Sequence, residues 1–356
     1  MMIFRSAQES DLDAIHHLIE NCGIGMTSLP KDKAILKKRL DLSCTSFNKA
    51  VNSPEDEYYL FVLEDPKTSE VVGISAIEAA TGHELPLYSF KVTKSTNISH
   101  SLNLRIDYEV LHLVNDNQGR SELCSLYLKP EYRHRANGLL LSRARLLFIA
   151  HYPNRFAATI IAEMRGISDE WGYSPFWEAV GSHFFQMNFA KADELTAKTN
   201  KQFIADLMPK NPLYVKLLPA EAQAVIGKPH NSTIPAMNIL MREGFRYNCS
   251  IDIFDGGPTI EAPCNQICTV ATNRVMTVKG ISDEASSKLY ILANTKLDFR
   301  ATIGKLIYNP HQGTCIIGKE TAELLKVKHG DCLRITPLQI DNSPHFSEEN
   351  AKNHEN

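Results

Sequence analysis

A strand, a basic loop and an apolar helix follow one another between residues 121 and 150. Residues 122–128 are mostly apolar and end before Pro130, which is the pattern of a buried strand. From Leu139 onward, apolar side chains recur at helical spacing. A short loop of small and basic residues joins the two segments. The chain therefore contains at least one unit in which a strand leads into a helix through a small-residue turn.

This loop suits the binding of an anion. Small residues at a helix start leave backbone N–H groups at the positive end of the helix dipole, and Arg133 and Arg135 add charged donors. The alternative is an ordinary strand–loop–helix connection whose basic residues face solvent, because short glycine-containing loops often resemble anion-binding motifs by chance. No Gly-Lys-Ser/Thr follows, so the loop is not a Walker loop, and the first two glycines of a dinucleotide fingerprint are missing.

Arg133-x-x-Ala136-x-Gly138 resembles the pyrophosphate loop of GNAT acyltransferases, which reads Arg/Gln-x-x-Gly-x-Gly/Ala after a strand. Ala136 replaces the middle glycine. The predicted order of strand, two helices, hairpin, strands, loop helix and strand is also that of a GNAT core. The resemblance implies that the strands before and after the loop helix splay apart to admit an acyl-CoA. Arg133, Ala136, Asn137 and Gly138 would then hold its pyrophosphate.

Hydrophobic periodicity predicts the remaining elements of the first 260 residues. Residues 84–114 suggest further strands, with polar loops at 94–101 and 115–120, and residues 191–223 are largely helical. The other predicted elements are strands at 3–5, 58–63, 71–77, 156–163 and 245–254, and helices beginning at residue 10 and spanning 32–42 and 236–243.

The pattern changes after residue 261. Short strands at 266–279, 288–292, 299–308, 315–318 and 330–336 surround one short helix at 321–325, which predicts a small β-barrel. The predicted fold is therefore α+β: a GNAT-like core of mixed sheet and flanking helices over residues 1–261, with a C-terminal β-barrel subdomain over 262–340. A helical segment at about 190–234 is an insertion in this core, or part of a second, degenerate half. The polar residues 341–356 are expected to be a disordered tail.

Composition excludes several classes of protein. The net charge of −3 favours neither nucleic acid nor an anionic membrane as a partner, and no apolar run reaches 18 residues. The first residues lack the apolar core of a signal peptide, so a cytoplasmic location is expected. The 8 cysteines include Cys264 and Cys268, but no second pair at zinc spacing follows them. We expect reduced thiols and no metal site.

Seven ordered segments together resemble the arginine N-succinyltransferase family. They span residues 1 to about 335, and their combination is more specific than any one of them. The segments are Gly25-Met-Thr-Ser-Leu-Pro30, Ser121-Glu-Leu-Cys-Ser-Leu126, Ala162-Glu-Met-Arg-Gly166, Gly172-Tyr-Ser-Pro-Phe-Trp177, Leu207-Met-Pro-Lys210, Glu243-Gly-Phe-Arg-Tyr247 and Ile251-Asp-Ile-Phe-Asp-Gly-Gly-Pro258. Ala136, Pro229 and residues 87–105 depart from the family pattern.

The resemblance implies succinyl-CoA as co-substrate, with no permanently bound cofactor. It implies the α-amino group of L-arginine, or of ornithine in related subunits, as acceptor. The product would be N2-succinylarginine, in the first step of arginine catabolism by the succinyltransferase route. Leu126 matches a succinyl-CoA contact and His230 matches the proton donor. The family also implies an oligomer of one or two kinds of chain.

Residue chemistry supports His230, because an imidazole titrates near neutral pH. It could return a proton to the CoA sulfur or take one from the arginine ammonium; a solvated surface histidine is the alternative. Glu163 and Arg165, at the end of the strand after the loop helix, are candidates for arginine binding, with Asp116 and Asp255 as further candidates. The alternative is that these charged residues form surface or structural ion pairs and do not bind arginine.

Two alternative functions stay open at this point. The chain could be a non-catalytic or regulatory subunit of a heteromeric arginine/ornithine succinyltransferase, or an acyltransferase for another amine or acyl-CoA.

Overall fold

The computed structural model describes residues 1–20, 22, 28, 30–83, 86–198, 202–282 and 288–339. The predicted tail over residues 341–356 lies outside this part of the chain. So does the family-like segment at residues 25–30, apart from Ser28 and Pro30.

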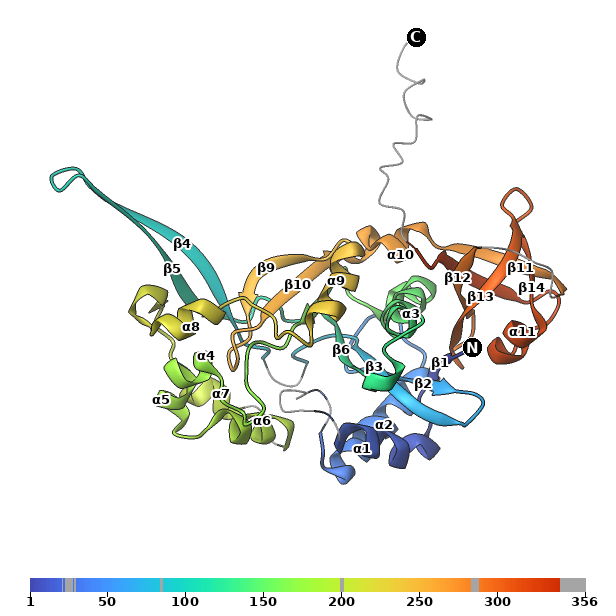
Figure 1. The fold of residues 1–356 in the computed structure, drawn as a ribbon, viewed down its shortest axis with the longest axis horizontal. Coiled ribbons are helices and arrows are strands. Elements are labelled where there is room, and N and C mark those ends of the chain that lie inside the picture. Colours follow the sequence, from blue (N-terminus) through green and yellow to red (C-terminus); the bar gives the residue numbers. More distant parts are fainter. Residues whose placement is uncertain are drawn as a thin grey trace, which may run out of the picture.

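A 15-stranded sheet runs from one end of the molecule to the other (Figure 1). Its strands follow the order β12-β15-β11-β14-β13-β1-β2-β3-β6-β7-β10-β9-β4-β5-β8. The strands are β1 (Ile3–Ser6), β2 (Tyr58–Asp65), β3 (Glu70–Glu78), β4 (Ser89–Ser99), β5 (Leu104–Val114), β6 (Ser121–Leu128), β7 (Thr159–Glu163), β8 (Leu213–Tyr214), β9 (Arg246–Ile251), β10 (Pro258–Pro263), β11 (Arg274–Ile281), β12 (Leu289–Asn294), β13 (Arg300–Asn309), β14 (Thr314–Ile317) and β15 (Cys332–Pro337).

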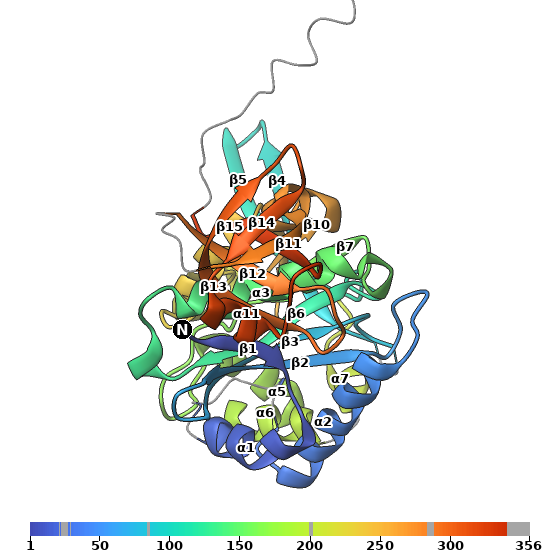
Figure 2. The same cartoon turned by 90° about the vertical axis from the view of Figure 1, so that its right-hand side faces the viewer.

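Helices cover both faces of the central strands. Helices α1 and α2 lie on one face of β1, β2 and β3, and α3 lies on the other (Figure 2). The helices are α1 (Leu12–Glu20), α2 (Lys33–Asn48), α3 (Asn137–His151), α4 (Pro175–Ala179), α5 (Gly181–Phe185), α6 (Phe189–Lys198), α7 (Gln202–Leu207), α8 (Ala220–Val225), α9 (Ile234–Arg242), α10 (Cys268–Thr272) and α11 (Lys319–Leu325).

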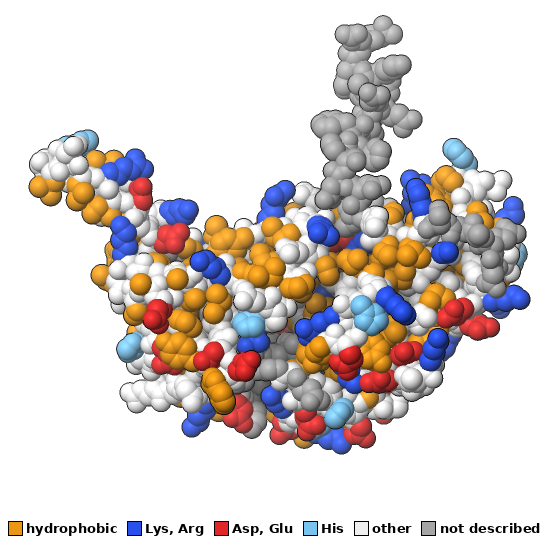
Figure 3. Space-filling view, viewed as in Figure 1, with side chains coloured by type: hydrophobic (Ala, Val, Ile, Leu, Met, Phe, Trp, Pro, Cys, Tyr) orange, Lys and Arg blue, Asp and Glu red, His pale blue; other side chains and the backbone are white. Residues whose placement is uncertain are grey.

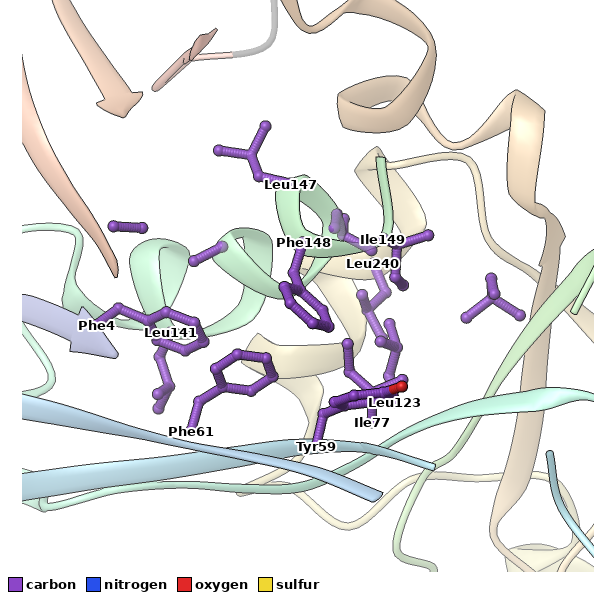
Figure 4. Packing of buried hydrophobic residues seen from close by; sticks show 14 of the residues in the cluster. Phe4, Tyr59, Phe61, Ile77, Leu123, Leu141, Leu147, Phe148, Ile149 and Leu240 are labelled. Atoms are coloured by element: carbon purple, nitrogen blue, oxygen red, sulfur yellow. The ribbon is translucent and has the colours of Figure 1, made fainter. Parts of the chain in front are cut away.

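The alternation of side chains along β2 explains why it is buried on both faces. Tyr59, Phe61 and Leu63 pack toward α3, whereas the residues between them pack toward α1 and α2. Around Phe148 of α3, the rings of Tyr59 and Phe61 lie 5.2 and 5.3 Å away between centroids (Figure 4). Helix α3 is buried on nearly every side because the sheet covers one face and α9, α10 and the C-terminal strands cover the other.

The predicted C-terminal β-barrel is confirmed. Strand β12 pairs with both β15 and β13, which closes β11 to β15 into a ring, and β13 joins this ring to β1. The start of the predicted strand at 266–279 is wrong, because Cys268–Thr272 forms α10. The backbone N–H of Thr269 donates to the buried Glu243, and this contact overrides the β-branched local sequence. The predicted domain boundary at residue 261 stays a prediction, as does the interpretation of residues 190–234 as an insertion.

Strands β4 and β5 form a long hairpin that projects from the end of the molecule opposite the barrel (Figure 1). They pair over all 11 residues of each strand, so the predicted polar loop at 94–101 is wrong as far as Ser99. Other strands pair with the hairpin only at its base, through residues such as Phe90 and Leu111. Both faces of the outer part are solvated, and hydrophobic alternation therefore does not mark it as a strand.

Candidate active site

The parallel strands β6 and β7 separate soon after they begin. They pair only at Ser121 with Ile160 and Glu122 with Ile161, and β6 then continues to Leu128 without β7 beside it. The two strands around the loop helix therefore diverge, and the GNAT-like core to which this divergence was ascribed stays a prediction. Where two strands separate, their backbone N–H and C=O groups no longer pair with each other. A ligand that carries amide groups can bind to them.

A β-bulge shapes the β6 side of this opening. Ala76 lies opposite Cys124 and Ile74 opposite Tyr127, so that two residues of β6 face the single Ser75. One of the two is Ser125, whose φ is +57°. The other is Leu126, the predicted succinyl-CoA contact, which is half-buried. A bulge turns backbone groups out of the ladder, and bulges are frequent beside active sites.

The buried Arg145 of α3 donates hydrogen bonds to the backbone next to this bulge. It is 1 % exposed, and its Nη1 donates to the carbonyl oxygens of Ala76 at 3.2 Å and Cys124 at 3.3 Å, two residues that pair with each other at one end of the bulge. Burial without a carboxylate among these partners lowers the pKa of Arg145 to about 10. The sequence analysis missed this residue, although an arginine within an apolar helix was a visible signal.

The loop after β6 leaves the start of α3 open. The Nε of Arg133 donates to the carbonyl of Leu128 at 3.0 Å, which holds the loop against the end of β6. Ala136 is the N-cap with φ of +65°, and no side chain caps the helix. Asn137 is buried and donates to the carbonyl of Tyr132 at 2.9 Å. The N–H of Asn137 donates to the carbonyl of His134 at 3.1 Å, but a methyl group on Gly138 would meet no atom within 4 Å, so a ligand can approach the helix start at Gly138.

His230 lies at the end of β7. Its backbone N–H donates to the carbonyl of Arg165 at 2.8 Å, two residues beyond the last residue of β7, Glu163. Its Nδ1 lies 2.7 Å from the hydroxyl of Ser232 and accepts the Ser232 N–H at 3.2 Å, so Nε2 is the remaining edge for a substrate. Burial, and then the charge of Arg165, lower the pKa of His230 below its usual value.

Close backbone packing fixes the segment that carries Arg165. A methyl group on Gly257 would lie 2.0 Å from the carbonyl oxygen of Met164, and one on Gly166 would lie 2.4 Å from that of Asp255. The carboxylate of Asp255 accepts the N–H groups of Gly166 at 2.7 Å and Gly257 at 2.9 Å. The two family-like segments at 162–166 and 251–258 are therefore the two halves of one packed turn.

Of the further acidic candidates, Asp255 is buried in this turn, where burial and Asp252 raise its pKa. Asp116 pairs with Lys91 at 3.5 Å.

A cavity of about 110 Å³ lies next to this turn. Glu163, Arg165 and Asp252 supply charged groups to its wall, and apolar residues that include Phe189 and Phe254 supply the rest. The predicted arginine-binding residues Glu163 and Arg165 therefore lie together, beside the strand end that carries His230. The structure groups the predicted residues into a set at the end of β6 and the start of α3, and a set at the end of β7.

The described residues contain one group of acidic side chains close enough to hold a metal ion, Glu55, Asp56 and Glu57. The ammonium group of Lys49 neutralises this acidic group, with its Nζ 2.8 Å from Glu57 and 3.1 Å from Asp56.

No helix in the described part of the chain is long and apolar enough to cross a bilayer. The cytoplasmic location expected from the sequence stays a prediction.

Comparison with known protein families shows which family the chain belongs to. The model of the arginine N-succinyltransferase beta subunit family matches residues 2–269, and the model of the C-terminal domain of that subunit matches residues 274–337. The chain belongs to the arginine N-succinyltransferase family. The resemblance given by the seven sequence segments is confirmed.

Relatives of this family match the chain along nearly its whole length. The arginine N-succinyltransferase of Yersinia pestis (strain Pestoides F) is 43% identical over 348 residues, covering 95% of this chain and 98% of the relative. The arginine N-succinyltransferase of Enterobacter sp. (strain 638) is 40% identical over 340 residues, with the same coverage. The structure of arginine/ornithine succinyltransferase subunit AI from Pseudomonas aeruginosa superimposes with a TM-score of 0.87 at 38% identity, covering 96% of this chain and 99% of that one.

Proposed function

We propose that the chain is an arginine N-succinyltransferase, which moves the succinyl group of succinyl-CoA to the α-amino group of L-arginine and releases N2-succinylarginine and CoA. The opening between β6 and β7 carries the proposal, because an uncapped helix start lies at the end of one strand and His230 at the end of the other. The names of the relatives supply the identity of the acyl group and of the acceptor.

In this proposal the core is that of a GNAT-like acyltransferase. The diverging parallel strands, the bulge at Leu126 and the loop leading into α3 support it. The pyrophosphate of succinyl-CoA binds at the start of α3, beside the N–H of Gly138, with Arg133, Ala136 and Asn137 around it. The pantetheine then lies along β6, and the thioester reaches the bulge. A fixed N–H donor there stabilises the oxyanion that forms on the thioester carbonyl.

The acyl group passes directly from sulfur to nitrogen. The thiol of Cys124, next to the bulge, is buried, and burial raises its pKa to about 12, so it is not available as a nucleophile. A C–N bond forms as the C–S bond breaks. The arginine ammonium loses two protons in total, of which one ends on the CoA sulfur and the other is released. His230 takes up one of these protons to become the imidazolium and gives the proton on its Nε2 to the sulfur, while its Nδ1 stays hydrogen-bonded to the Ser232 hydroxyl.

The acceptor arginine binds on the β7 side. Its guanidinium enters the cavity beside Glu163 and Asp252, where carboxylates favour a cation. Arg165 binds the carboxylate of the amino acid. This arrangement brings the α-amino group toward the opening between the strands, and orientation of the two reactants supplies much of the rate.

Incubation of the purified chain with succinyl-CoA and L-arginine tests the proposal. Free thiol should increase with time, and mass spectrometry should detect N2-succinylarginine in equal amount. His230→Ala should retain succinyl-CoA binding and lose most of the turnover. A wild-type chain that binds no CoA, or a His230→Ala variant with the normal rate, would contradict the respective assignment. A panel of ornithine, other amines and other acyl-CoA donors defines the specificity.

A second candidate function is that of one subunit in a heteromeric arginine/ornithine succinyltransferase. The family description as a beta subunit and the naming of the Pseudomonas aeruginosa protein as subunit AI favour it. This function predicts that the chain alone is inactive and that a second, related chain restores thiol release. Turnover by the chain alone would exclude a purely non-catalytic role.

Assembly into an oligomer of one or two kinds of chain belongs to the same proposal. Hydrophobic side chains line the projecting hairpin (Figure 3), and Ile98 and Leu102 near its tip are 58 and 73 % exposed. A two-stranded ribbon without further partners is only marginally stable, and exposed apolar patches mark interfaces. Light scattering of the pure chain should give a multiple of the chain mass, reduced by Ile98→Ser with Leu102→Ser. A monomer mass for the wild type, alone and with its related chain, would rule out this role.

A further inference from the structure

A large cavity lies between the start of α3 and the C-terminal barrel. Its volume is about 580 Å³, which is within the range of small-molecule sites. Four parts of the chain line it: the N-terminal residues Met1 and Met2, the turn between β2 and β3, the loop that leads into α3, and the barrel. None of the lining residues belongs to β6 or β7, so the cavity is separate from the opening that would take the thioester.

Positively charged side chains from three of these parts line the cavity. Arg135 comes from the loop, Lys67 from the β2–β3 turn and Lys305 from barrel strand β13. Two carboxylates also line it, but Glu320 pairs with the N-terminal ammonium group at 3.3 Å, and Asp65 accepts the backbone N–H of Lys67 at 3.0 Å. Within the described part of the chain, none of the three cations has a carboxylate within 4.0 Å. The cavity therefore favours an anion.

The same cavity has apolar walls and an aromatic edge. Leu289 and Ile303 of the barrel line it, with the almost fully buried Leu140 of α3 at its base. The rings of Tyr132 and His134 are nearly parallel, 6.4 Å apart between centroids, and both line the cavity. Flat apolar and aromatic surfaces suit a purine base, whereas the converging cations suit a phosphate. The combination matches a nucleotide better than an amino acid or a simple anion.

The loop connects this cavity to the proposed pyrophosphate site. Arg133 points to the β6 side, where it donates to the Leu128 carbonyl and its charge acts on Tyr127. Arg135 of the same loop and Asn137 at the start of α3 line the cavity, and Arg133 does not. A molecule whose diphosphate lies against the start of α3 can therefore extend one end along β6 and the other end into the cavity.

We propose that this cavity binds the 3′-phosphoadenosine end of the acyl-CoA, so that the C-terminal barrel forms part of the donor site. This inference rests on the proposed function, which supplies the acyl-CoA. The adenine lies against Leu289 and Ile303 of the barrel. The 3′-phosphate pairs with Lys305 and Lys67. The barrel thus recognises the donor by the phosphate that distinguishes CoA from its dephosphorylated form.

Calorimetric titration of the full chain with CoA and with 3′-dephospho-CoA tests the inference. The wild type should bind CoA at least about tenfold more tightly, as expected for a charge-assisted contact to a phosphate. Lys305→Ala should reduce this ratio several-fold while leaving the affinity for 3′-dephospho-CoA nearly unchanged, and Lys67→Ala should act in the same direction. Both lysines are exposed, so circular dichroism should show folded variants.

Lys279→Ala is the matched control, because Lys279 is an exposed lysine of barrel strand β11 that does not line the cavity. It should leave the ratio of the two affinities unchanged. A wild-type ratio near one, or a Lys305→Ala variant with the full wild-type ratio, would overturn the inference and leave the proposed function intact. A wild type that binds no CoA would overturn both.

Discussion

The buried ion pair between Arg143 and Glu243 permits a quantitative prediction. Arg143 lies on α3 and Glu243 directly after α9; their side chains are 1 and 0 % exposed, and Nε lies 2.6 Å from Oε1. Arg143 also donates to the carbonyls of Pro337 and Leu338 at the end of β15, and Glu243 accepts the N–H of Thr269 at 2.6 Å. The pair thus connects α3, α10 and the barrel.

Glu243→Ala should lower the free energy of unfolding by about 4 kcal/mol, since it leaves a buried guanidinium without its counter-charge. This value already includes the lost hydrogen bond from the Thr269 N–H, because the free energies of contacts within one network are not additive. Glu243→Gln, which keeps an acceptor oxygen, should cost about half as much. The paired replacement Glu243→Leu with Arg143→Met should recover most of the loss, because burying two apolar groups avoids the desolvation of both charges.

Urea unfolding followed by circular dichroism and by tryptophan fluorescence measures these values, and coincident transitions would justify a two-state treatment. Asp41→Ala is the control, because Asp41 forms an exposed pair with Lys37 at 2.8 Å and should cost less than about 0.5 kcal/mol. If Glu243→Ala costs no more than Asp41→Ala, the reasoning about the buried network is refuted.

Two further predictions concern the proposed site. Gly138→Ala should leave the free chain as stable or up to about 1 kcal/mol more stable, because its methyl group meets no atom and alanine favours a helix. Its affinity for CoA should fall at least about tenfold in calorimetry, because the methyl group takes the space of a phosphate oxygen; an unchanged affinity would exclude a phosphate at this helix start. The pKa of the His230 ring, followed by NMR, should lie below the usual 6.5 and should rise in Arg165→Met, because a neighbouring positive charge disfavours the imidazolium. A pKa that stays constant or falls in this variant would contradict the electrostatic coupling, and His230→Asn identifies the signal.

Local periodicity was sufficient for the elements that lie in the core. The alternation of β2, whose two faces meet different helices, and the apolar run of α3 were readable because burial leaves a regular pattern. The barrel strands were readable for the same reason, except that the first begins at Arg274 and not at residue 266. The outer halves of β4 and β5 were not, because solvent covers both of their faces. The strand predicted over 156–163 begins only at Thr159, after a 3-10 turn at Pro153–Arg155.

Some features of the candidate site were likewise predictable from the sequence, and others were not. The loop of Arg133 to Gly138 was predictable, because a small-residue turn before a helix is a local feature. The bulge at Ser125 and Leu126 was not, because no glycine marks the positive φ of Ser125. The role of Arg145 depends on the carbonyls of two strands that approach it only in the folded chain.

The sequence by itself determined the family, the strand–loop–helix unit and the residues expected to take part in the chemistry, since these depend on neighbouring residues and on ordered motifs. Only the tertiary structure decided where they meet. Long-range pairing separates β6 from β7, a hydrogen bond to Arg165 places His230 at the end of β7, and closure of the barrel through β12 and β13 brings Lys305 to the loop before α3. Such contacts join residues far apart in the chain, and their geometry depends on packing and hydrogen bonding that local sequence patterns do not contain.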